Sequence, residues 1–526
     1  MIIDIHTHVP AKSQWEKLLT QSRDNGVLFT VVSSLHVPTW ARYPTPEQVR
    51  AANEEARDFV EFANGMALWF AYLNPQNENW PEELERCVSE GASGIKLWVS
   101  IKREEDGSLD NVRRLLKHAG GAGLPVLLHA WNRTDENLPG ELDFAEFATL
   151  AREFPQTTMI GAHGGTNWRH SSGLFTDLPN ARVDVCGGYP EAGQTEALVA
   201  ELGADRVLYG SDALGRSIPS QVAKVALAEL SDEVKARIFW SNAAKLLNIT
   251  DEMIARARAT SALLPPTDPL PVPDFSEDHF CFCGRLPMLG ALGVEAEALD
   301  KMLGAAEIDT AYAADARGMF ELDILAANQA YIEAVARCER ITPLATLMPY
   351  APNWPVQLAE ARRLGFDGGI VHPYLHSWRL DDAEFAPFFA ACAEAGFPLW
   401  INCSVADYRL RHRGLACRPV LHGEVVAFCR QAPRNAYVFQ ALKAPDITAA
   451  LEACPEREDL RFDMALLSDA TAALPPFLVA HGTGALVHGS EFPFRPLGSV
   501  RWTTEYLCGL RSGDSLDGAP CTLCDS

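Results

Sequence analysis

The chain begins Met1-Ile-Ile-Asp-Ile-His-Thr-His8, and this stretch decides how the rest of the sequence is interpreted. It has the composition of a short buried strand, with Asp4, His6 and His8 at every second position. Alternate side chains of a strand lie on the same face, so these three are expected to point the same way. Two histidines at the end of a strand, with a carboxylate beneath them, suit half of a metal site.

Strand-like stretches alternate with helical patterns through the first half of the chain. Strands are expected at 2–6, 27–33, 66–73, 94–99, 125–130, 158–163, 182–186 and 206–211. Helical patterns lie between them, among others at 46–63, 81–90, 109–120, 143–153 and 190–202. This alternation over about 250 residues predicts a (β/α)8 TIM-type barrel. The alternative, a doubly wound open sheet, would normally carry a glycine fingerprint after the first strand, where His6-Thr-His8 stands.

Polar residues stand where several of these strands are predicted to end. They are His6, His8, Lys96, His129, His163 and Asp212. In barrels of this kind, functional side chains gather at the carboxyl ends of the strands. A single histidine there is more often structural than a ligand, but four histidines and an aspartate on one rim favour a metal site.

The pattern Asp-x-His-x-His, followed by His, His and Asp on strands five, six and eight, resembles the amidohydrolase superfamily. The stretch Ser241-Asn-Ala-Ala-Lys-Leu-Leu247 also resembles the end of its amidohydrolase-related branch. That branch includes aminocarboxymuconate semialdehyde decarboxylase and resorcylate decarboxylases as well as hydrolases. The resemblance extends from residue 1 to about residue 250. It implies that His6, His8, His129 and Asp212 bind one divalent metal, most often zinc, with manganese or iron as alternatives. It also implies that His163 is the catalytic base or supports the ligands from behind, and that it could contact the metal.

The chemistry of such a site is consistent with hydrolysis. Three imidazoles and one carboxylate leave an open position, where a metal lowers the pKa of water and polarises a carbonyl. Asp212 and His163 are expected to take up and return the proton. Three roles remain open for Lys96: bridging two metals after carboxylation, anchoring a substrate carboxylate, or extending into solvent.

Aromatic and cationic residues follow the same strands and are the candidates for substrate binding. Besides Lys96 they are Trp98, Trp131, Arg133, Trp168, Arg169 and Arg216. Aromatic rings with arginines suit a planar or acidic organic molecule. For each residue alone, packing or a solvated surface is the simpler explanation.

The first half recurs after a proline-rich stretch. Residues 261–274 contain five prolines and are predicted to form a linker. Asn79-Trp-Pro81 then matches Asn353-Trp-Pro355, and Gly-Ser-Asp212 matches Gly-Ser-Glu491. The prediction is a tandem duplication, with a metal-dependent barrel over 1–260 and a degenerate barrel over 275–526. Two unrelated α/β domains are the alternative.

Most of the ligand set is missing from the copy. By sequence spacing, Glu277, His279 and Cys281 fall opposite Asp4, His6 and His8. The other ligand positions are occupied by Asn402, Ala441, Glu491 and Ile370, opposite His129, His163, Asp212 and Lys96. The second barrel is therefore predicted to be a pseudo-enzyme half that packs on the first. Some members of the branch that the chain resembles act as dimers in which a partner's arginine reaches the active site, and this resemblance makes Arg409, Arg411 and Arg413 candidates for that role. Cys281, Cys283, Cys521 and Cys524 form either a structural zinc site or, more simply, a set of unlinked thiols.

Composition limits the function classes. The net charge of −24 argues against nucleic acid or an anionic membrane as a partner. A strand that begins at residue 2 leaves no room for a signal peptide, and the 13 cysteines are mostly scattered, so we expect a cytoplasmic protein that acts on a small molecule. Whether it forms a homo-oligomer is left open. Three activities are weighed: hydrolysis of a C–N or C–O bond, non-oxidative decarboxylation of an unsaturated or aromatic acid, and a non-catalytic scaffold.

Overall fold

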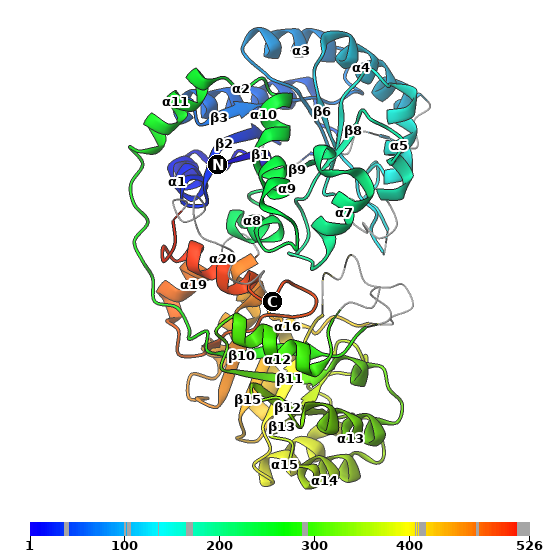
Figure 1. Cartoon of the computed structure of the whole chain (residues 1–526), viewed down its shortest axis with the longest axis vertical. Helices are drawn as coiled ribbons and strands as arrows, with labels where there is room; N and C mark the ends of the chain where they lie inside the picture. Colours follow the sequence, from blue (N-terminus) through cyan, green and yellow to red (C-terminus); the bar gives the residue numbers. More distant parts are fainter. Residues whose placement is uncertain are drawn as a thin grey trace. The chain divides into compact units, whose positions relative to one another are not determined.

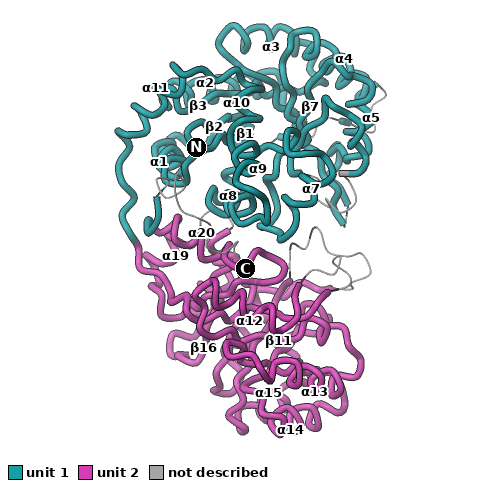
Figure 2. Tube along the Cα trace, in the orientation of Figure 1, with its two compact units in different colours: residues 1–269, 509–519 teal, residues 270–508, 520–526 magenta. Residues whose placement is uncertain are grey.

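The computed structural model describes residues 1–35, 41–98, 101–102, 107–134, 136–164, 172–286, 293–405, 407, 409, 417–469 and 473–512. The chain divides into two compact units, whose main parts are Met1–Pro269 and Leu270–Cys508 (Figure 2). The division falls within the proline-rich stretch 261–274. Each unit is described by itself, as unit 1 and unit 2.

The strands of unit 1 are parallel and follow one another around the unit in chain order (Figure 1). Their bounds are β1 (Ile2–His8), β2 (Val27–Ser33), β3 (Ala67–Trp69), β4 (Ala71–Tyr72), β5 (Ile95–Leu97), β6 (Val126–His129), β7 (Met159–Ala162), β8 (Ala181–Asp184) and β9 (Val207–Leu208). They form a sheet in the order β1-β2-β3 and a second sheet from β4 to β9. Every strand predicted in the first half is present, and the one predicted at 66–73 is divided at Phe70 into β3 and β4.

Backbone hydrogen bonds join the first and last strands of unit 1. The amide of Ile5 donates to the carbonyl of Tyr209 at 3.0 Å, and the amide of Asp212 donates to the carbonyl of His6 at 2.7 Å. These bonds bring the carboxyl end of β1 beside the segment that follows β9. Because the strands are parallel, the ends that carry His6, His129 and Asp212 meet on one rim.

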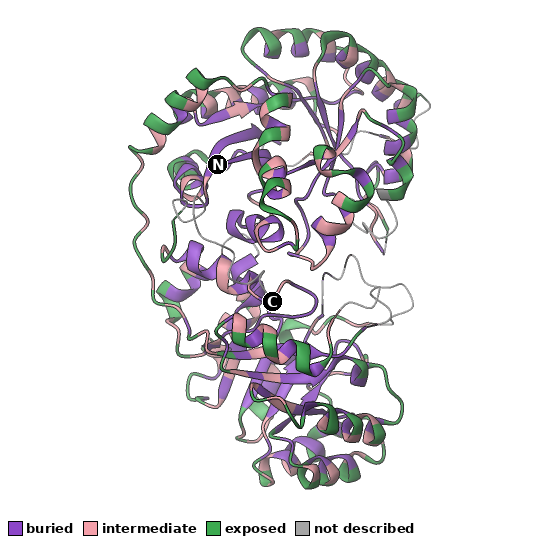
Figure 3. Cartoon of the chain, in the orientation of Figure 1, coloured by how far each residue is buried: buried purple, intermediate pink, exposed green. Residues whose placement is uncertain are grey.

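Helices cover the outside of unit 1, with exposed outer faces and buried strands inside (Figure 3). They are α1 (Trp15–Asp24), α2 (Pro46–Ala63), α3 (Trp80–Ser89), α4 (Ser108–Ala122), α5 (Phe144–Glu153), α7 (Gln194–Leu202), α8 (Ile218–Ala226), α9 (Asp232–Ala236), α10 (Asn242–Leu246) and α11 (Asp251–Ser261). Local sequence explains the clearest of them. Thr45 and Gln48 form a capping box before α2, Pro46 occupies its first turn, and Asn64 ends it in the left-handed conformation.

Unit 2 contains a parallel eight-stranded sheet in the order β10 to β17. The strands are β10 (Glu277–Cys283), β11 (Thr310–Asp315), β12 (Ile341–Thr346), β13 (Gly368–Val371), β14 (Leu399–Asn402), β15 (Tyr437–Gln440), β16 (Leu460–Asp463) and β17 (Leu486–Val487). The helices are α12 (Ala296–Ala305), α13 (Ile324–Val335), α14 (Trp354–Leu364), α15 (Ala386–Glu394), α16 (His422–Gln431), α17 (Ala444–Ala453), α18 (Ala465–Asp469), α19 (Leu474–His481) and α20 (Ser499–Leu507). The amide of His279 donates to the carbonyl of His488, and that of Phe282 to Phe492, so the sheet is nearly closed into a barrel.

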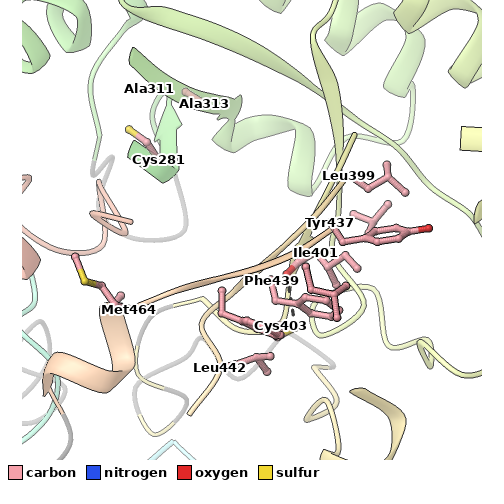
Figure 4. Packing of buried hydrophobic residues seen from close by; sticks show 14 of the residues in the cluster. Cys281, Ala311, Ala313, Leu399, Ile401, Cys403, Tyr437, Phe439, Leu442 and Met464 are labelled. Atoms are coloured by element: carbon pink, nitrogen blue, oxygen red, sulfur yellow. Dashed lines mark hydrogen bonds between the residues drawn. The ribbon is translucent and has the colours of Figure 1, made fainter. Parts of the chain in front are cut away.

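The strands of unit 2 contribute to a large apolar core. Leu399 and Ile401 of β14 and Tyr437 and Phe439 of β15 lie in this cluster, and Figure 4 shows them close to one another. This core buries strong β-formers on consecutive strands, which stabilises the sheet. No helix in the described part of the chain combines the length and apolar character that a membrane span requires.

Candidate metal centre

Asp4 connects the first strand of unit 1, through hydrogen bonds, to the segment that follows the last strand. Its carboxylate accepts hydrogen bonds from the hydroxyls of Thr7 at 2.6 Å and Ser211 at 2.5 Å, and from the amides of His6 and Ser211 at 3.2 and 2.9 Å. Burial raises the pKa of Asp4 to about 6, although these donors favour the ionised form. Asp4 is therefore part of the framework beneath the two histidines.

The ring of His6 is oriented by a hydrogen bond at Nδ1. Its Nδ1 lies 2.9 Å from Oδ2 of the fully buried Asp184, and its Nε2 lies 2.6 Å from Nζ of Lys96. Burial and the neighbouring Lys96 lower the pKa of His6 to about 4, so the ring is neutral near pH 7. A neutral ring that donates from Nδ1 to Asp184 carries its lone pair on Nε2.

His8 is oriented in the same way. Its Nδ1 lies 3.2 Å from the carbonyl oxygen of Ser33 and its Nε2 lies 3.3 Å from Oδ1 of Asp212. The same Oδ1 is 3.9 Å from Nε2 of His6. The ligand atoms of His6, His8 and Asp212 all lie within 4.8 Å of one another. Two imidazoles anchored at Nδ1 thus direct two Nε2 atoms at one carboxylate.

Asp212 forms the more open side of this cluster. Its side chain is 22% exposed, whereas those of His6 and His8 are 1% and 6% exposed. Burial opposes ionisation, but His8, His163 and His6 lower the pKa of Asp212 well below its usual range. Asp212 has a φ of 54° and His163 a φ of 70°, strained values for residues other than glycine that are typical of functional sites.

His129 and His163 belong to a separate chain of hydrogen bonds. Nε2 of His129 lies 2.6 Å from Oε1 of Glu141, and Nδ1 of His129 lies 2.9 Å from Nε2 of His163. Burial would raise the pKa of Glu141, but bonds from His129, Arg133 and the Leu138 amide lower it to about 2. With Glu141 ionised, His129 donates from Nε2 and accepts at Nδ1. Nδ1 of His129 accepts a hydrogen bond from His163, and this bond would have to break before His129 could bind a metal as a fourth ligand.

Lys96 is completely buried in the middle of the site. The expectation that it extends into solvent is therefore wrong. Burial lowers its pKa, although Asp212 and Asp184 oppose this effect. Its amine lies 2.6 Å from Nε2 of His6, where a metal bound to that nitrogen would lie, so metal binding there requires the amine to move away.

Two of the predicted substrate residues lie beside the histidines. The ring of Trp131 is 4.8 Å from that of His163, and the ring of Trp98 is 6.2 Å from that of His129. The Arg133 guanidinium lies 5.1 Å from the Trp131 ring and contacts Glu141 at 3.2 Å. Arg216 lies over the ring of Tyr189, at 5.1 Å. The predicted Trp168 and Arg169 lie outside the described residues, as do Arg411, Arg413, Cys521 and Cys524.

Asp184, Cys186 and Glu141 contribute to the site without having been predicted. Asp184 and Cys186 lie at the end of the predicted strand 182–186, so an acidic residue at the end of a buried strand was a usable signal. Glu141 lies 12 residues after its partner His129, and no local pattern links the two. The bond exists because the amide of Trp131 donates to the carbonyl of Leu142, which brings this loop back over the end of β6.

The hydrogen bonds of unit 2 correct the predicted register of the copy by one residue. Oδ1 of Asp278 accepts from the amides of Phe280 and Ser490, as Oδ1 of Asp4 accepts from those of His6 and Ser211. The residues opposite Asp4, His6 and His8 are therefore Asp278, Phe280 and Phe282, and not Glu277, His279 and Cys281. The slip matters because a shift of one residue moves every side chain to the other face of a strand.

The other predicted equivalences agree with the pairing of the strands. Lys96 pairs with Leu127 and Ile370 pairs with Trp400, which places His129 opposite Asn402 two residues further on. His163 and Ala441 have φ values of 70° and 58°, and their amides donate to Asp184 and Asp463. Glu491, opposite Asp212, forms an ion pair with Arg495. Unit 2 thus has the framework of this site without its imidazoles.

Comparisons with known proteins agree with the first half of the chain. Residues 3–249 match the family model described as Amidohydrolase. Unit 1 is therefore similar to amidohydrolases over most of its length. No curated protein matches the chain.

Several solved structures are similar to about half of the chain. A 2,6-dihydroxybenzoate decarboxylase from Rhizobium is 19% identical with a TM-score of 0.38, covering 47% of this chain and 99% of its own. A dihydroxybenzoic acid decarboxylase from Polaromonas with bound manganese is 19% identical with a TM-score of 0.37, covering 48% and 99%. A putative 2-pyrone-4,6-dicarboxylic acid hydrolase from Pseudomonas putida is 20% identical with a TM-score of 0.36, covering 47% and 97%.

Proposed function

We propose that unit 1 is a metal-dependent hydrolase that acts on a C–N or C–O bond of a small, carboxylate-bearing organic molecule. One observation carries this proposal: His6 and His8 are both held at Nδ1, and both Nε2 atoms face Oδ1 of Asp212. Asp184 and the Ser33 carbonyl fix these orientations, as partners of ligand histidines do. The amidohydrolase match over residues 3–249 supports the same conclusion.

The donor set fits a divalent metal ion. Two imidazoles and an ionised carboxylate suit zinc, manganese or iron, and we favour zinc. When bound, the metal would lower the pKa of a water molecule and polarise the scissile group. Asp212 and His163 lie beside this position and would take up and return the proton. His129 and Glu141 keep His163 in one orientation.

Aromatic surfaces next to the histidines support a planar substrate. Trp98 and Trp131 lie beside His129 and His163, and the guanidinium of Arg133 lies over the Trp131 ring. The same surfaces favour a second activity, non-oxidative decarboxylation of an aromatic or unsaturated acid, since its substrate is a flat anion. A non-catalytic scaffold is disfavoured because nothing in a scaffold requires two Nε2 atoms at one carboxylate.

We further propose that unit 2 arose by duplication of unit 1 and that both are (β/α)8 barrels. The shared hydrogen bonds of Asp4 and Asp278 support this, as do those of Asn53 and Asn328, whose side chains bond both backbone groups of Tyr72 and Thr346. Unit 2 would then be a pseudo-enzyme half. The boundaries 1–260 and 275–526, the cytoplasmic location and a homo-oligomer stay predictions.

Metal analysis tests the proposed function. The purified full-length chain, loaded with manganese and then dialysed, is expected to hold one equivalent of manganese, and His8→Ala is expected to hold almost none. His279→Ala, which changes a histidine of the corresponding strand in unit 2, is the matched control and should keep the metal. An unchanged metal content in His8→Ala contradicts the proposal.

A product assay then separates the two activities. The wild-type enzyme is offered a panel of amides, lactones and aromatic acids, with CO2 measured alongside hydrolysis. Turnover of amides or lactones without CO2 supports hydrolysis. CO2 release from an acid, absent in His8→Ala, would replace hydrolysis by decarboxylation.

A further inference from the structure

A second group of ligand atoms lies on the opposite side of His6 from Asp212. Sγ of Cys186 is 3.1 Å from Nδ1 of His6 and 3.4 Å from Nδ1 of His163, and all three side chains are buried. We propose that these atoms form a second metal site, selective for thiophilic divalent cations such as zinc or cadmium. We further propose that filling it inhibits the enzyme, which is the part that rests on the proposed function.

The distances from the sulfur to the two nitrogens are close to those of a tetrahedral site. Zinc bonds of about 2.3 Å to sulfur and about 2.0 Å to nitrogen place neighbouring ligand atoms about 3.3–3.6 Å apart. The sulfur lies within a few tenths of an ångström of these separations from both nitrogens. Small movements of the side chains would therefore complete the site.

Asp184 supports this group of ligand atoms. Its Oδ2 lies 2.9 Å from Nδ1 of His6, while its Oδ1 accepts from the amides of His163 and Cys186 at 2.8 and 3.2 Å. These bonds hold the ends of β7 and β8 together, so His163 and Cys186 face the same carboxylate. The donor set would be one thiolate and two imidazoles.

The sulfur determines which metals bind. A thiolate prefers zinc or cadmium, whereas the set of His6, His8 and Asp212 also accepts the harder manganese ion. When the metal binds, the Cys186 thiol loses its proton to water. The proton on Nδ1 of His6 is replaced by the metal, and the ring regains a proton on Nε2 from water, so one proton is released overall.

The two sites share His6 and exclude one another. A neutral imidazole has one lone pair, which lies on either Nδ1 or Nε2. If Nδ1 of His6 binds a metal, its Nε2 carries a proton and cannot bind the metal held by His8 and Asp212. An excess of a thiophilic metal would thus remove one ligand from the catalytic site.

Cadmium chloride and manganese chloride are the probes for this proposal. The experiment uses the full chain with Cys521 and Cys524 changed to serine, so that the thiols of the tail do not contribute. Cadmium is expected to produce one thiolate-to-cadmium charge-transfer band, and to displace bound manganese as measured by electron paramagnetic resonance. Cys186→Ser and Cys186→Ala should both lose the band and require at least about tenfold more cadmium for displacement.

The controls separate this proposal from the proposed function. Cys87→Ser changes the other cysteine of unit 1, which is also buried and contacts Glu83, and it should behave like the parent. His8→Ala should lose manganese but keep the cadmium band. A band of unchanged strength in both Cys186 variants overturns the second site. A parent protein that shows the band but binds no manganese retains the second site and contradicts the proposed function.

Discussion

Strands β1 and β10 have the same framework and different chemistry. Asp4 and Asp278 each accept a hydrogen bond from the amide two residues further along the chain. Each also accepts one from the amide of a serine that follows the last strand of its unit, Ser211 or Ser490. In each unit a glycine packs closely against the residue two positions after this aspartate. A Cβ added at Gly210 would lie 2.9 Å from Cβ of His6, and a Cβ added at Gly489 would lie 2.6 Å from Cβ of Phe280. The framework is therefore independent of the two imidazoles, because Phe280 and Phe282 occupy in unit 2 the places that His6 and His8 occupy in unit 1.

The buried aspartates of β8 and β16 show what this replacement changes. Asp184 and Asp463 accept equivalent backbone amides, but only Asp184 has an imidazole partner. Burial raises the pKa of both groups; His6 outweighs this effect and lowers the pKa of Asp184 below its usual value. Asp463 faces Glu491 and no histidine, and its pKa rises to about 7. One histidine thus reverses the protonation preference of a buried acid.

The largest expected effect comes from removing the framework aspartates. Asp4→Ala leaves two amides and two hydroxyls without their buried acceptor and should destabilise β1 by about 4 kcal/mol. Asp278→Ala removes the acceptor of two amides and should cost β10 about 2 kcal/mol. Hydrogen exchange measured by mass spectrometry on peptides from each strand would detect these losses separately. Equal losses in the two strands would show that the hydroxyl bonds to Asp4 contribute nothing.

The second prediction concerns pH. The folded pKa of Asp463 is raised above its unfolded value, so its contribution to stability is complete below the unfolded pKa and is lost as pH rises toward about 7. Between pH 5 and pH 8, unit 2 should lose about 2.5 kcal/mol of stability through this group. Asp184, with a lowered pKa, acts in the opposite sense and costs unit 1 stability only at acidic pH. Exchange rates of β16 and β8, corrected for intrinsic rates, should diverge accordingly; parallel behaviour would contradict the role of His6.

The third prediction concerns Glu141, which bonds to the first of the two linked imidazoles, His129 and His163. Among the described residues of unit 2, Asn402 and Ala441 stand in the places of these histidines. Glu141→Gln removes the charge that orients His129 and His163 and should lower kcat/KM about 10- to 100-fold on any substrate that the panel identifies. Manganese affinity should change little, because the contacts of His6 and His8 are untouched. Glu153→Gln, which alters an exposed partner of Arg113, is the control. A loss of metal equal to the loss of activity would place His129 in the ligand set.

The smallest effect is expected at Thr7, whose hydroxyl donates to Asp4 at 2.6 Å. The corresponding residue of β10, three positions after Asp278, is Cys281. Thr7→Cys should reduce the stability of unit 1 by about 1 kcal/mol, since a thiol is a weaker donor. Denaturant unfolding followed by exchange of β1 peptides would measure the change. A stability equal to that of wild type would show that Ser211 alone satisfies this carboxylate oxygen.

Sequence patterns predicted the strands and most of the site because both depend on local periodicity. His6 and His8 share a face, and His129, His163 and Asp212 follow strand ends, so their meeting on one rim needed only the parallel topology. Asp184 and Glu141 depend on contacts between distant segments, which one sequence does not reveal. The register of β10 was ambiguous because Glu277 and Asp278 are both acidic, and the bond from the Ser490 amide, which joins distant segments, selects Asp278.

The central claim is that His6 and His8 hold the metal. It is tested most directly by measuring manganese binding after the inward-facing residues of β1 are replaced by those of β10. The variant His6→Phe with His8→Phe gives β1 the side chains of Phe280 and Phe282, and Phe280→Leu with Phe282→Leu is its counterpart in unit 2. Titration calorimetry should find one manganese ion per chain in the wild type and in the unit 2 variant. It should find none in the unit 1 variant, with circular dichroism unchanged. One manganese ion retained by the folded His6→Phe, His8→Phe chain would contradict the claim that these two histidines hold the metal.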